Sequence, residues 1–295
     1  WRTGEIHTYL HDLAAQYPNL VTLSQAGTSY EGTPIWSIKI SSTNDGTKPV
    51  VFGDATIHAR EWIAPMACLY LIHQLVVNSA DNADLLDVDW VLIPLANPDG
   101  YEFSHTNNRM WRKTRSINPG STCIGVDGNR NYRVNWGYSG ISTNPCSDIY
   151  LGPAPHSEVE VQAVSNELTK YADRVKLYLS FHSFGDYFIY PWGHDRIPHP
   201  NNQQLDHVGE RASDAMYYFN GRRYTVGNSA ILLYPAAGAS DDYAAGEHHI
   251  DLSYTIELTG GGNTGFDLPA SQIHPVSSHL FIGLSEMARY IAENY

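Results

Sequence analysis

The imidazole and carboxylate side chains that could perform chemistry lie directly after apolar runs of the sequence. These residues are His58 and Glu61 after residues 50–52, His182 after residues 177–181, and Glu257 after residues 254–256. Two imidazoles and one carboxylate with an open fourth position are a catalytic zinc set, because Zn²⁺ accepts nitrogen and carboxylate ligands and needs a vacant site for water. His58, Glu61 and His182 would form that set, and Glu257 would be the base.

The spacing His-x-x-Glu or His-x-x-Asp occurs three times, so it does not identify a metal site by itself. His207 and Glu210 fall within an amphipathic helical pattern, which is typical of a solvated pair. A second pair, His248 and Asp251, is expected on a loop surface. The pair that begins at His58 differs, because its histidine ends a buried strand and its glutamate begins the following helix. Both side chains can then point into one crevice.

Arginines gather in an irregular part of an otherwise acidic chain. The segment Asn97–Pro155 is rich in Asn, Gly, Ser and Arg and has little periodicity, which is typical of a functional loop region. It contains Arg109, Arg112 and Arg130, and guanidinium groups bind carboxylates in a bidentate manner. The segment therefore predicts an anion site. The alternative is a set of structural arginines that pair with neighbouring acids.

Predicted strands and helices alternate along the chain. Apolar, β-branched runs predict strands at residues 21–23, 35–40, 50–52, 88–95, 175–181 and 252–256. Apolar residues at three-and-four spacing predict helices at residues 5–16, 61–77, 157–171, 202–219 and 273–293. Ser157 and Glu160 are expected to form a capping box. The alternation predicts an α/β fold, a mixed and mostly parallel twisted sheet with helices on both faces and the zinc site at the carboxyl ends of its strands.

The composition is typical of one globular domain over residues 1–295. Hydrophobic residues make up 42% of the chain and charged residues 17%, and no linker or repeat divides it. The formal charge of 18 − 31 = −13 argues against nucleic acid and anionic membrane surfaces as partners. No apolar run reaches the roughly 18–20 residues that a spanning helix needs. Nothing in the sequence requires an oligomer, and we expect a monomer.

Three cysteines are too few for a disulfide scaffold. Cys68 lies inside an apolar helical pattern and is predicted to be a buried thiol. Cys123 and Cys146 lie in loop sequence, which favours one bridge across a long loop in an oxidising compartment. The alternative is three unpaired thiols in a cytosolic protein.

Several separated motifs together resemble one enzyme family. In chain order they are His58-Ala59-Arg60-Glu61, Asn108-Arg109-Met110-Trp111-Arg112, Asp127-Gly128-Asn129-Arg130-Asn131, His182-Ser183, Tyr234 and Glu257. Their order and intervals, with the Cys123/Cys146 pair among them, resemble the zinc metallocarboxypeptidases of the pancreatic A/B type over nearly the whole chain. The resemblance implies a secreted peptidase domain, made as a zymogen, that acts on peptide and protein C-termini. It also implies two further partners, the cleaved pro-segment and proteinaceous carboxypeptidase inhibitors.

The resemblance assigns a role to each matching residue. His58, Glu61 and His182 resemble the ligands of one Zn²⁺, and Glu257 resembles the catalytic glutamate. Asp127 resembles the residue that orients the first histidine, and Arg112 resembles the one that polarises the scissile carbonyl. Asn129, Arg130 and Tyr234 resemble the residues that bind the substrate's terminal carboxylate. Arg60, Arg109 and Phe266 match outer-subsite or pocket positions.

The family's specificity pocket includes the position that Asp241 occupies. An acidic residue at the base of the pocket resembles the B-type enzymes, which accept Lys or Arg, whereas an apolar residue would resemble the A-type. Gly193 and Ser229 match other pocket-lining positions and leave room for a long side chain. The alternatives are that Asp242 takes the place of Asp241 after a one-residue loop shift, or that Asp241 points to solvent.

The sequence leaves alternatives to a B-type zinc carboxypeptidase. One is the same mechanism with an A-type preference for aromatic or aliphatic residues. Another is a zinc hydrolase of the same fold that acts on a small acylated amino acid, which the presence of Arg112, Asn129, Arg130 and Tyr234 together disfavours. The last is a catalytically silent zinc-binding module, which would have no need of a base at Glu257.

Overall fold

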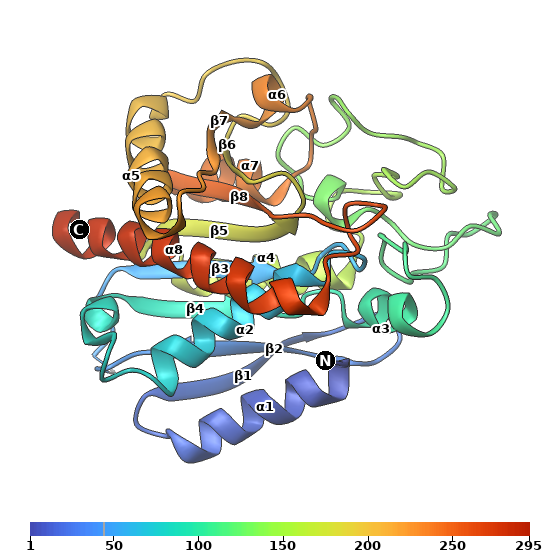
Figure 1. Cartoon of the computed structure of the whole chain (residues 1–295). Helices are drawn as coiled ribbons and strands as arrows, with labels where there is room; N and C mark the ends of the chain where they lie inside the picture. The colour runs from blue at the N-terminus through green and yellow to red at the C-terminus, as the bar shows by residue number, and fades with distance from the viewer. Residues whose placement is uncertain (44) are drawn as a thin grey trace.

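An eight-stranded mixed sheet forms the centre of the molecule (Figure 1). In the computed structural model, which describes residues 1–43 and 45–295, the strand order is β1-β2-β4-β3-β5-β8-β6-β7. The strands are β1 (Val21–Thr28), β2 (Pro34–Ile40), β3 (Val50–Ala55), β4 (Asp89–Ile93), β5 (Val175–Ser183), β6 (Tyr187–Tyr190), β7 (Thr225–Asn228) and β8 (Leu252–Leu258). Four of the seven neighbouring pairs are parallel, as predicted.

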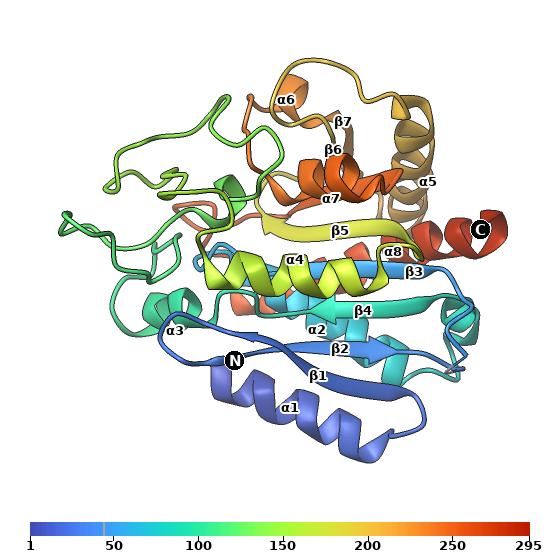
Figure 2. The same ribbon diagram turned by 180° about the vertical axis from the view of Figure 1, so that it is seen from behind.

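Helices cover both faces of the sheet. They are α1 (Thr3–Gln16), α2 (Ile63–Val76), α3 (Pro98–Thr106), α4 (Val159–Tyr171), α5 (Asn202–Asn220), α6 (Ser229–Leu232), α7 (Ser240–His248) and α8 (Ile273–Asn294). Helices α2 and α8 lie in front of the sheet in Figure 1, and α4 and α7 lie in front of it in the reverse view of Figure 2. Within the described residues, no helix is both long and apolar enough to cross a membrane.

Successive side chains of the central strands point to opposite faces of the sheet, so the core is divided into two buried clusters. In β5, Leu177, Leu179 and Phe181 face the cluster that α1, α2, α5 and α8 cover. Tyr178 faces the opposite cluster, which includes residues of α4 and α7. Side chains of alternate residues point to opposite faces of a sheet. Ser180 and His182 therefore follow Tyr178 onto the α4/α7 face, and this alternation aims the candidate ligand His182.

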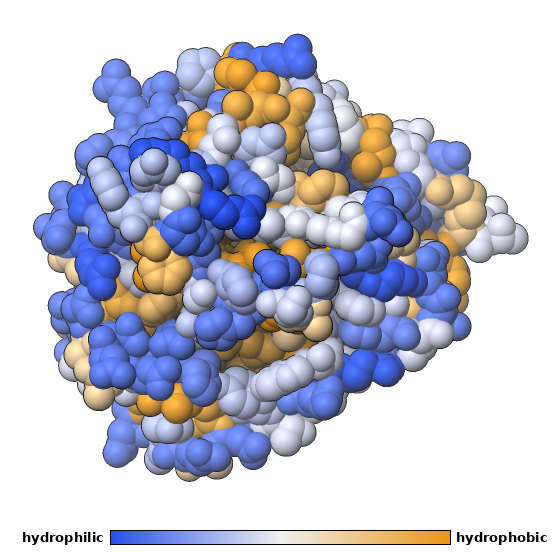
Figure 3. Space-filling view, in the orientation of Figure 1, coloured by the Kyte–Doolittle hydropathy of each residue, from blue (hydrophilic) through white to orange (hydrophobic). Residues whose placement is uncertain are grey.

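The carboxyl ends of β3, β4, β5 and β8 meet at one edge of the sheet, because these strands are parallel neighbours. The irregular segment after α3 lies against this edge and is drawn in green in Figure 1. Figure 3 shows a largely hydrophilic face with apolar side chains in small groups. The edge is where the fold positions its candidate site.

Three expectations for local structure need correction. The segment 97–155 is not wholly irregular, because Asn97 caps α3 by accepting a hydrogen bond from the Gly100 amide at 2.9 Å and Pro98 begins the helix. The predicted capping box at Ser157 is absent, since α4 begins at Val159 after Glu158 and has no side-chain cap. His58 does not end a strand and Glu61 does not begin a helix, because β3 ends at Ala55 and α2 begins at Ile63, so both lie in the connection between them. The short elements β6, β7, α6 and α7 were not predicted from the sequence.

The Glu160 side chain is fully buried instead of capping its helix. Its Oε1 accepts a hydrogen bond from the Tyr30 amide at 2.9 Å, while its Oε2 has no partner among the described residues. Burial raises the pKa of Glu160 from 4.5 to about 7, and the charges of Glu158 and Asp99 add to this effect. Folding therefore favours the protonated form of Glu160 over the ionised form.

Glu160→Gln is expected to reduce the loss of stability at alkaline pH. Because the folded-state pKa is the higher one, the stability that protonated Glu160 contributes is fully present below pH 4.5 and is lost as pH rises through 7. The full loss is about 3 kcal/mol. Urea unfolding of both proteins at pH 5 and pH 8 measures it. If the two proteins lose the same free energy of unfolding between these pH values, this account of Glu160 is wrong.

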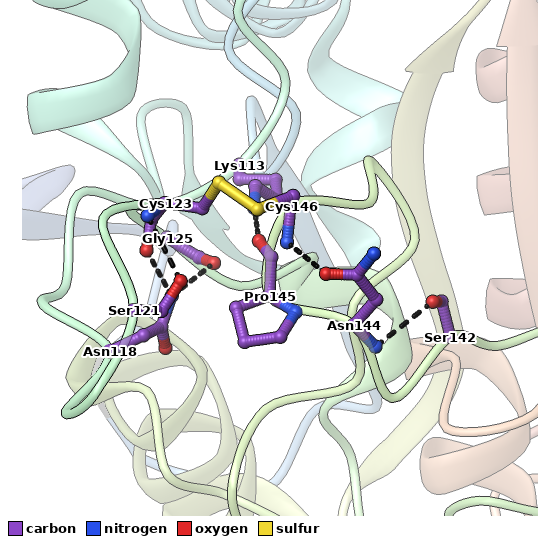
Figure 4. The surroundings of a disulfide bond; sticks show 9 residues. All are labelled: Lys113, Asn118, Ser121, Cys123, Gly125, Ser142, Asn144, Pro145 and Cys146. Atoms are coloured by element: carbon purple, nitrogen blue, oxygen red, sulfur yellow. Dashed lines mark hydrogen bonds between the residues drawn. A yellow bond between two sulfur atoms is a disulfide. The ribbon is translucent and has the colours of Figure 1, made fainter.

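A disulfide joins Cys123 and Cys146, with their Cα atoms 5.0 Å apart, as predicted (Figure 4). Cys68 is free and buried, also as predicted. Hydrogen bonds hold the loops on both sides of the bridge. The Cys123 amide donates to Ser121 Oγ at 3.0 Å, and Lys113 Nζ donates to the Pro145 carbonyl at 2.6 Å. The bridge therefore ties together two loops of the segment that borders the candidate site.

Replacing both Cys123 and Cys146 by serine is expected to lower the free energy of unfolding by about 3 kcal/mol, because it releases a closed loop in the unfolded chain. The bonded residues are separated by 23 positions. Urea titrations of the two proteins at one fixed zinc concentration measure the change, and wild type treated with a reducing agent is the matched control. An unchanged unfolding midpoint in both cases would contradict the expectation.

Candidate active site

The three predicted ligands converge at the edge of the sheet. His58 Nδ1 lies 2.8 Å from Glu61 Oε1, and His182 Nδ1 lies 3.0 Å from Glu61 Oε2. The two Nδ1 atoms are 3.1 Å apart. All three residues are buried, and they are the one group of histidine, cysteine and acidic residues in the described chain whose ligand atoms lie close enough to hold a metal ion. The other two His-x-x-acid pairs form no such group.

The outer nitrogen of each histidine has its own partner. His58 Nε2 is 2.8 Å from Asp127 Oδ1, and His182 Nε2 is 3.1 Å from Ser180 Oγ. When Nε2 donates to these acceptors, the proton of a neutral imidazole is there and the lone pair of Nδ1 faces the other histidine. Two such lone pairs beside a carboxylate fit Zn²⁺, which binds neutral imidazole and carboxylate oxygen. The residues present therefore fit the metal.

Strand register places Glu257 beside the ligand group. In the parallel pair β5 and β8, His182 is the register partner of Glu257. Burial raises the pKa of Glu257 to about 8, and the negative charge of Glu61 adds to the effect. A bound cation would lower this value. A carboxyl group whose pKa is lifted toward neutrality in a cavity is suited to accept and return a proton.

Asp127 connects a ligand histidine to an arginine. Its Oδ1 faces His58, and its Oδ2 accepts two hydrogen bonds from Arg112, from Nε at 3.1 Å and Nη2 at 2.8 Å. Burial alone would raise the pKa of Asp127, but the charge of Arg112 holds it well below its ordinary value. The ionised carboxylate therefore fixes the His58 ring and the Arg112 guanidinium at the same time.

A short 3-10 turn, Gly128–Arg130, follows Asp127 and positions the predicted carboxylate-binding residues. Asn129 Oδ1 accepts a hydrogen bond from the Ser240 amide at 2.9 Å. Arg130 is 3% exposed, and its Nε donates to the Gly140 carbonyl at 2.9 Å. Tyr234 lies at the mouth and is 57% exposed. A buried guanidinium beside a polar amide can bind an anion strongly, because water competes poorly there.

Asp241 and Asp242 have different environments, although they are adjacent at the start of α7. Asp242 is fully buried and bonded to a loop: its carboxylate accepts from the Gly193 amide at 2.7 Å and the His194 amide at 3.0 Å. Asp241 is 2% exposed and lines the central cavity. Burial and the adjacent charge of Asp242 raise the pKa of Asp241 to about 7. Asp241 is thus buried and not directed to solvent.

One cavity of about 260 Å³ brings most of the predicted residues together. Its lining includes His58, Arg60, Glu61, Arg112, Asn129, Arg130, His182, Ser229, Tyr234, Asp241, Glu257 and Phe266. Asp127 lies behind its ligand histidine, and Arg109 lines a neighbouring cavity instead. The Gly193 amide donates to Asp242, and the open side of Gly193 faces Ser229 and Ala236, which both line the cavity.

Arg60 and Phe266 form one side of the mouth. The guanidinium carbon of Arg60 lies 4.5 Å from the centre of the Phe266 ring. Arg109 holds both residues through their backbones, since it donates to the Arg60 carbonyl at 2.8 Å and to the Phe266 carbonyl at 2.6 Å. Arg109 therefore supports the rim without lining the cavity.

Comparison with known proteins gives the family. A family description of zinc carboxypeptidases matches residues 6–282. Carboxypeptidase B of Astacus astacus is 42% identical over 294 residues, which are 99% of this chain and 96% of that protein. The chain belongs to the zinc carboxypeptidase family.

Solved structures agree with this carboxypeptidase assignment. Bovine thrombin-activatable fibrinolysis inhibitor in complex with tick carboxypeptidase inhibitor gives a TM-score of 0.94 at 34% identity, covering 100% of this chain and 98% of that chain. Carboxypeptidase A from Helicoverpa armigera also gives 0.94 at 34% identity, covering 100% and 74% of the two chains. This protein is therefore a zinc-dependent exopeptidase that hydrolyses C-terminal peptide bonds.

Some residues of this carboxypeptidase site were missed in the sequence. Thr255 lines the cavity and lies two residues before Glu257 on β8, so the period-2 alternation of a strand was the signal that could have found it. Ser180 lies two residues before His182 on β5 and could have been found in the same way. Asp54 contacts Ser180 from the neighbouring strand, and no local pattern predicts that contact.

Proposed function

We propose that this carboxypeptidase removes C-terminal arginine and lysine. Asp241 carries this proposal: it is a buried carboxylate that lines the catalytic cavity, while the adjacent Asp242 is fully bonded elsewhere. Ionised Asp241 would pair with a guanidinium or ammonium group away from water. The B-type name of the Astacus relative supports this specificity, and the A-type name of the Helicoverpa structure identifies the competing one.

The proposed roles in catalysis follow from the positions of the side chains. His58, Glu61 and His182 would hold one Zn²⁺. When bound, Zn²⁺ supplies Lewis acidity that activates water and polarises the scissile carbonyl. Glu257 would remove a proton from the attacking water and then deliver it to the leaving amine. Arg112 faces the same cavity and would stabilise negative charge that develops on the carbonyl oxygen.

Three residues would restrict cleavage to the last peptide bond. Arg130 and Asn129 line the cavity beside the Zn²⁺ ligands, and Tyr234 stands at its mouth. A substrate without a free α-carboxylate would leave the buried Arg130 guanidinium without its anion, which costs binding energy. Arg60 and Phe266 at the rim would contact residues that precede the terminal one.

The protein's environment and partners also belong to this proposal. The Cys123–Cys146 disulfide supports a secreted protein, because disulfides persist in oxidising compartments. The inhibitor bound to the bovine structure supports proteinaceous inhibitors as partners of this chain. We further propose a monomeric catalytic domain over residues 1–295 that is released from a zymogen by removal of its pro-segment. Protein and peptide C-termini would be its substrates.

Peptides of one sequence that differ only in their last residue test the specificity. They are incubated with the zinc-loaded protein, and the released amino acid is identified by mass spectrometry. Release of Arg and Lys, with C-terminally amidated peptides uncut as the control, is the expected result. Release of Phe and Leu alone would assign the A-type preference. If no peptide is cleaved by zinc-loaded protein, the catalytic proposal is wrong.

A further inference from the structure

A chain of hydrogen bonds runs behind His182, on the side away from the other ligands. His182 Nε2 lies 3.1 Å from Ser180 Oγ, and Ser180 Oγ lies 3.2 Å from Asp54 Oδ2. The second oxygen of this carboxylate, Oδ1, accepts a hydrogen bond from the Tyr178 hydroxyl. The three residues behind the ligand are at most 1% exposed. The chain therefore ends on a carboxylate in the interior of the protein.

The sheet builds this chain from two neighbouring strands. Tyr178, Ser180 and His182 alternate along β5 and so share one face of the sheet. Asp54 lies on β3, where it is the register partner of Ser180 in the parallel pair. The position of each group is thus fixed by backbone hydrogen bonding instead of by a mobile loop.

The direction of the hydrogen bonds follows from the use of His182 as a ligand. A neutral imidazole that offers its Nδ1 lone pair to a metal carries its proton on Nε2, and this proton needs an acceptor. Ser180 Oγ is the acceptor in contact with that nitrogen. The serine proton is then free for Asp54 Oδ2, and Tyr178 donates to the other oxygen. With Asp54 as the final acceptor, the Nε2–H of His182 and the hydroxyl groups of Ser180 and Tyr178 each have a hydrogen-bond acceptor.

We propose that Ser180 and Asp54 are positioning residues that hold His182 in the tautomer and ring orientation needed to bind zinc. The inference rests on the proposed role of His182 as a ligand. Asp127 contacts His58 directly, whereas the Asp54 carboxylate acts on His182 through a hydroxyl. Both histidine ligands then have a buried carboxylate behind them. Partners of ligating histidines commonly contribute 10–100-fold to metal affinity.

Zinc affinity of the variants Ser180→Ala and Asp54→Asn tests this proposal. The affinity is measured on purified full-length protein by competition with a chelator of known affinity, which needs no substrate. We expect zinc to bind about 10–100-fold more weakly in each variant than in wild type. The double variant should lose little more than either single one, because the two residues act in one chain.

Two control variants separate this effect from general damage to the core. Ser37→Ala removes a buried strand hydroxyl that has no hydrogen-bond partner among the described residues. Asp89→Asn alters a carboxylate that is 1% exposed and accepts from Ser41 Oγ at 2.6 Å, at the opposite end of the sheet's parallel strands. Both controls should bind zinc with wild-type affinity. If Asp54→Asn does not fold, the zinc affinity of Ser180→Ala alone tests the proposal.

The ring nitrogens of His182 give a second readout. In the zinc-loaded wild type, ¹⁵N chemical shifts should report a proton on Nε2 hydrogen-bonded to an acceptor, and this signature should change in Ser180→Ala. Unchanged zinc affinity and unchanged shifts in Ser180→Ala would overturn the inference while leaving the proposed function intact. Failure of the wild type to bind zinc at these residues would instead overturn the proposed function on which it rests.

Discussion

Glu257→Gln is expected to abolish peptide hydrolysis while zinc stays bound. Glutamine has nearly the same shape as glutamate but cannot accept a proton from water at neutral pH. We expect kcat to fall roughly 10³-fold or more, at the upper part of the range for general acid–base catalysis. Zinc should remain at one ion per chain, because the metal-holding group is His58, Glu61 and His182. Steady-state kinetics together with metal analysis of the same sample measure both quantities.

Glu247→Gln is a matched control for this variant, since its side chain is exposed on α7, outside the lining of the catalytic cavity. Its kcat should equal that of wild type. Wild-type activity in Glu257→Gln would exclude the proposed base. Loss of zinc together with activity would show that Glu257 supports the metal site instead of acting on water.

Asp241→Asn is expected to remove the preference for a C-terminal arginine. The variant keeps the shape of the pocket but cannot supply the negative charge that a desolvated guanidinium needs. Removing one partner of a buried charge pair costs about 2–5 kcal/mol, so the Arg/Phe ratio of kcat/KM should fall by roughly 30- to 5,000-fold. Two blocked dipeptides that differ in the last residue measure this ratio.

Asp242→Asn is the control that separates the two neighbouring carboxylates. It alters the residue that holds the Gly193 and His194 amides, so a lower stability is expected, with the Arg/Phe ratio largely kept at pH 8, where Asp241 is already ionised in wild type. If Asp242→Asn lost the arginine preference and Asp241→Asn kept it, the assignment of the pocket residue would be reversed.

The same ratio should depend on pH in wild type. Burial and the adjacent Asp242 raise the pKa of Asp241 to about 7, so protonation removes its charge as pH falls through this value. The Arg/Phe ratio should therefore rise between pH 6 and pH 8. Because both substrates share the metal and Glu257, the titration of these groups largely cancels in the ratio. A pH-independent ratio in wild type would contradict the account, whereas Asp241→Asn should show no dependence.

The parts of the site that lie at or near the carboxyl ends of strands could be predicted from the sequence. His58, His182 and Glu257 each follow a buried apolar run, and parallel strands bring their carboxyl ends to one edge. The separate motifs then predicted their roles through the resemblance to a family. The disulfide was also predictable, because two of three cysteines fall in loop sequence.

Other features depend on contacts between residues far apart in the chain. Ser157 and Glu160 have the spacing of a capping box, yet Glu160 instead packs against the Tyr30 amide and Ser157 contacts Asn131 at 3.0 Å. The partner of Ser180 on β3 is set by strand register, which the sequence of β5 does not contain. The separation of Asp241 from Asp242 depends on which carboxylate the Gly193 loop binds. Tertiary packing decides each of these cases.

The most direct test compares kcat/KM for blocked dipeptides ending in Arg and in Phe, before and after zinc removal by a chelator and again after zinc is restored. The account predicts a clear preference for Arg that disappears with the metal and returns with it, since the Zn²⁺ group and Asp241 line one cavity. A chelator-sensitive preference for Phe would contradict the role of Asp241. Hydrolysis that persists at full rate without zinc would contradict the mechanism itself.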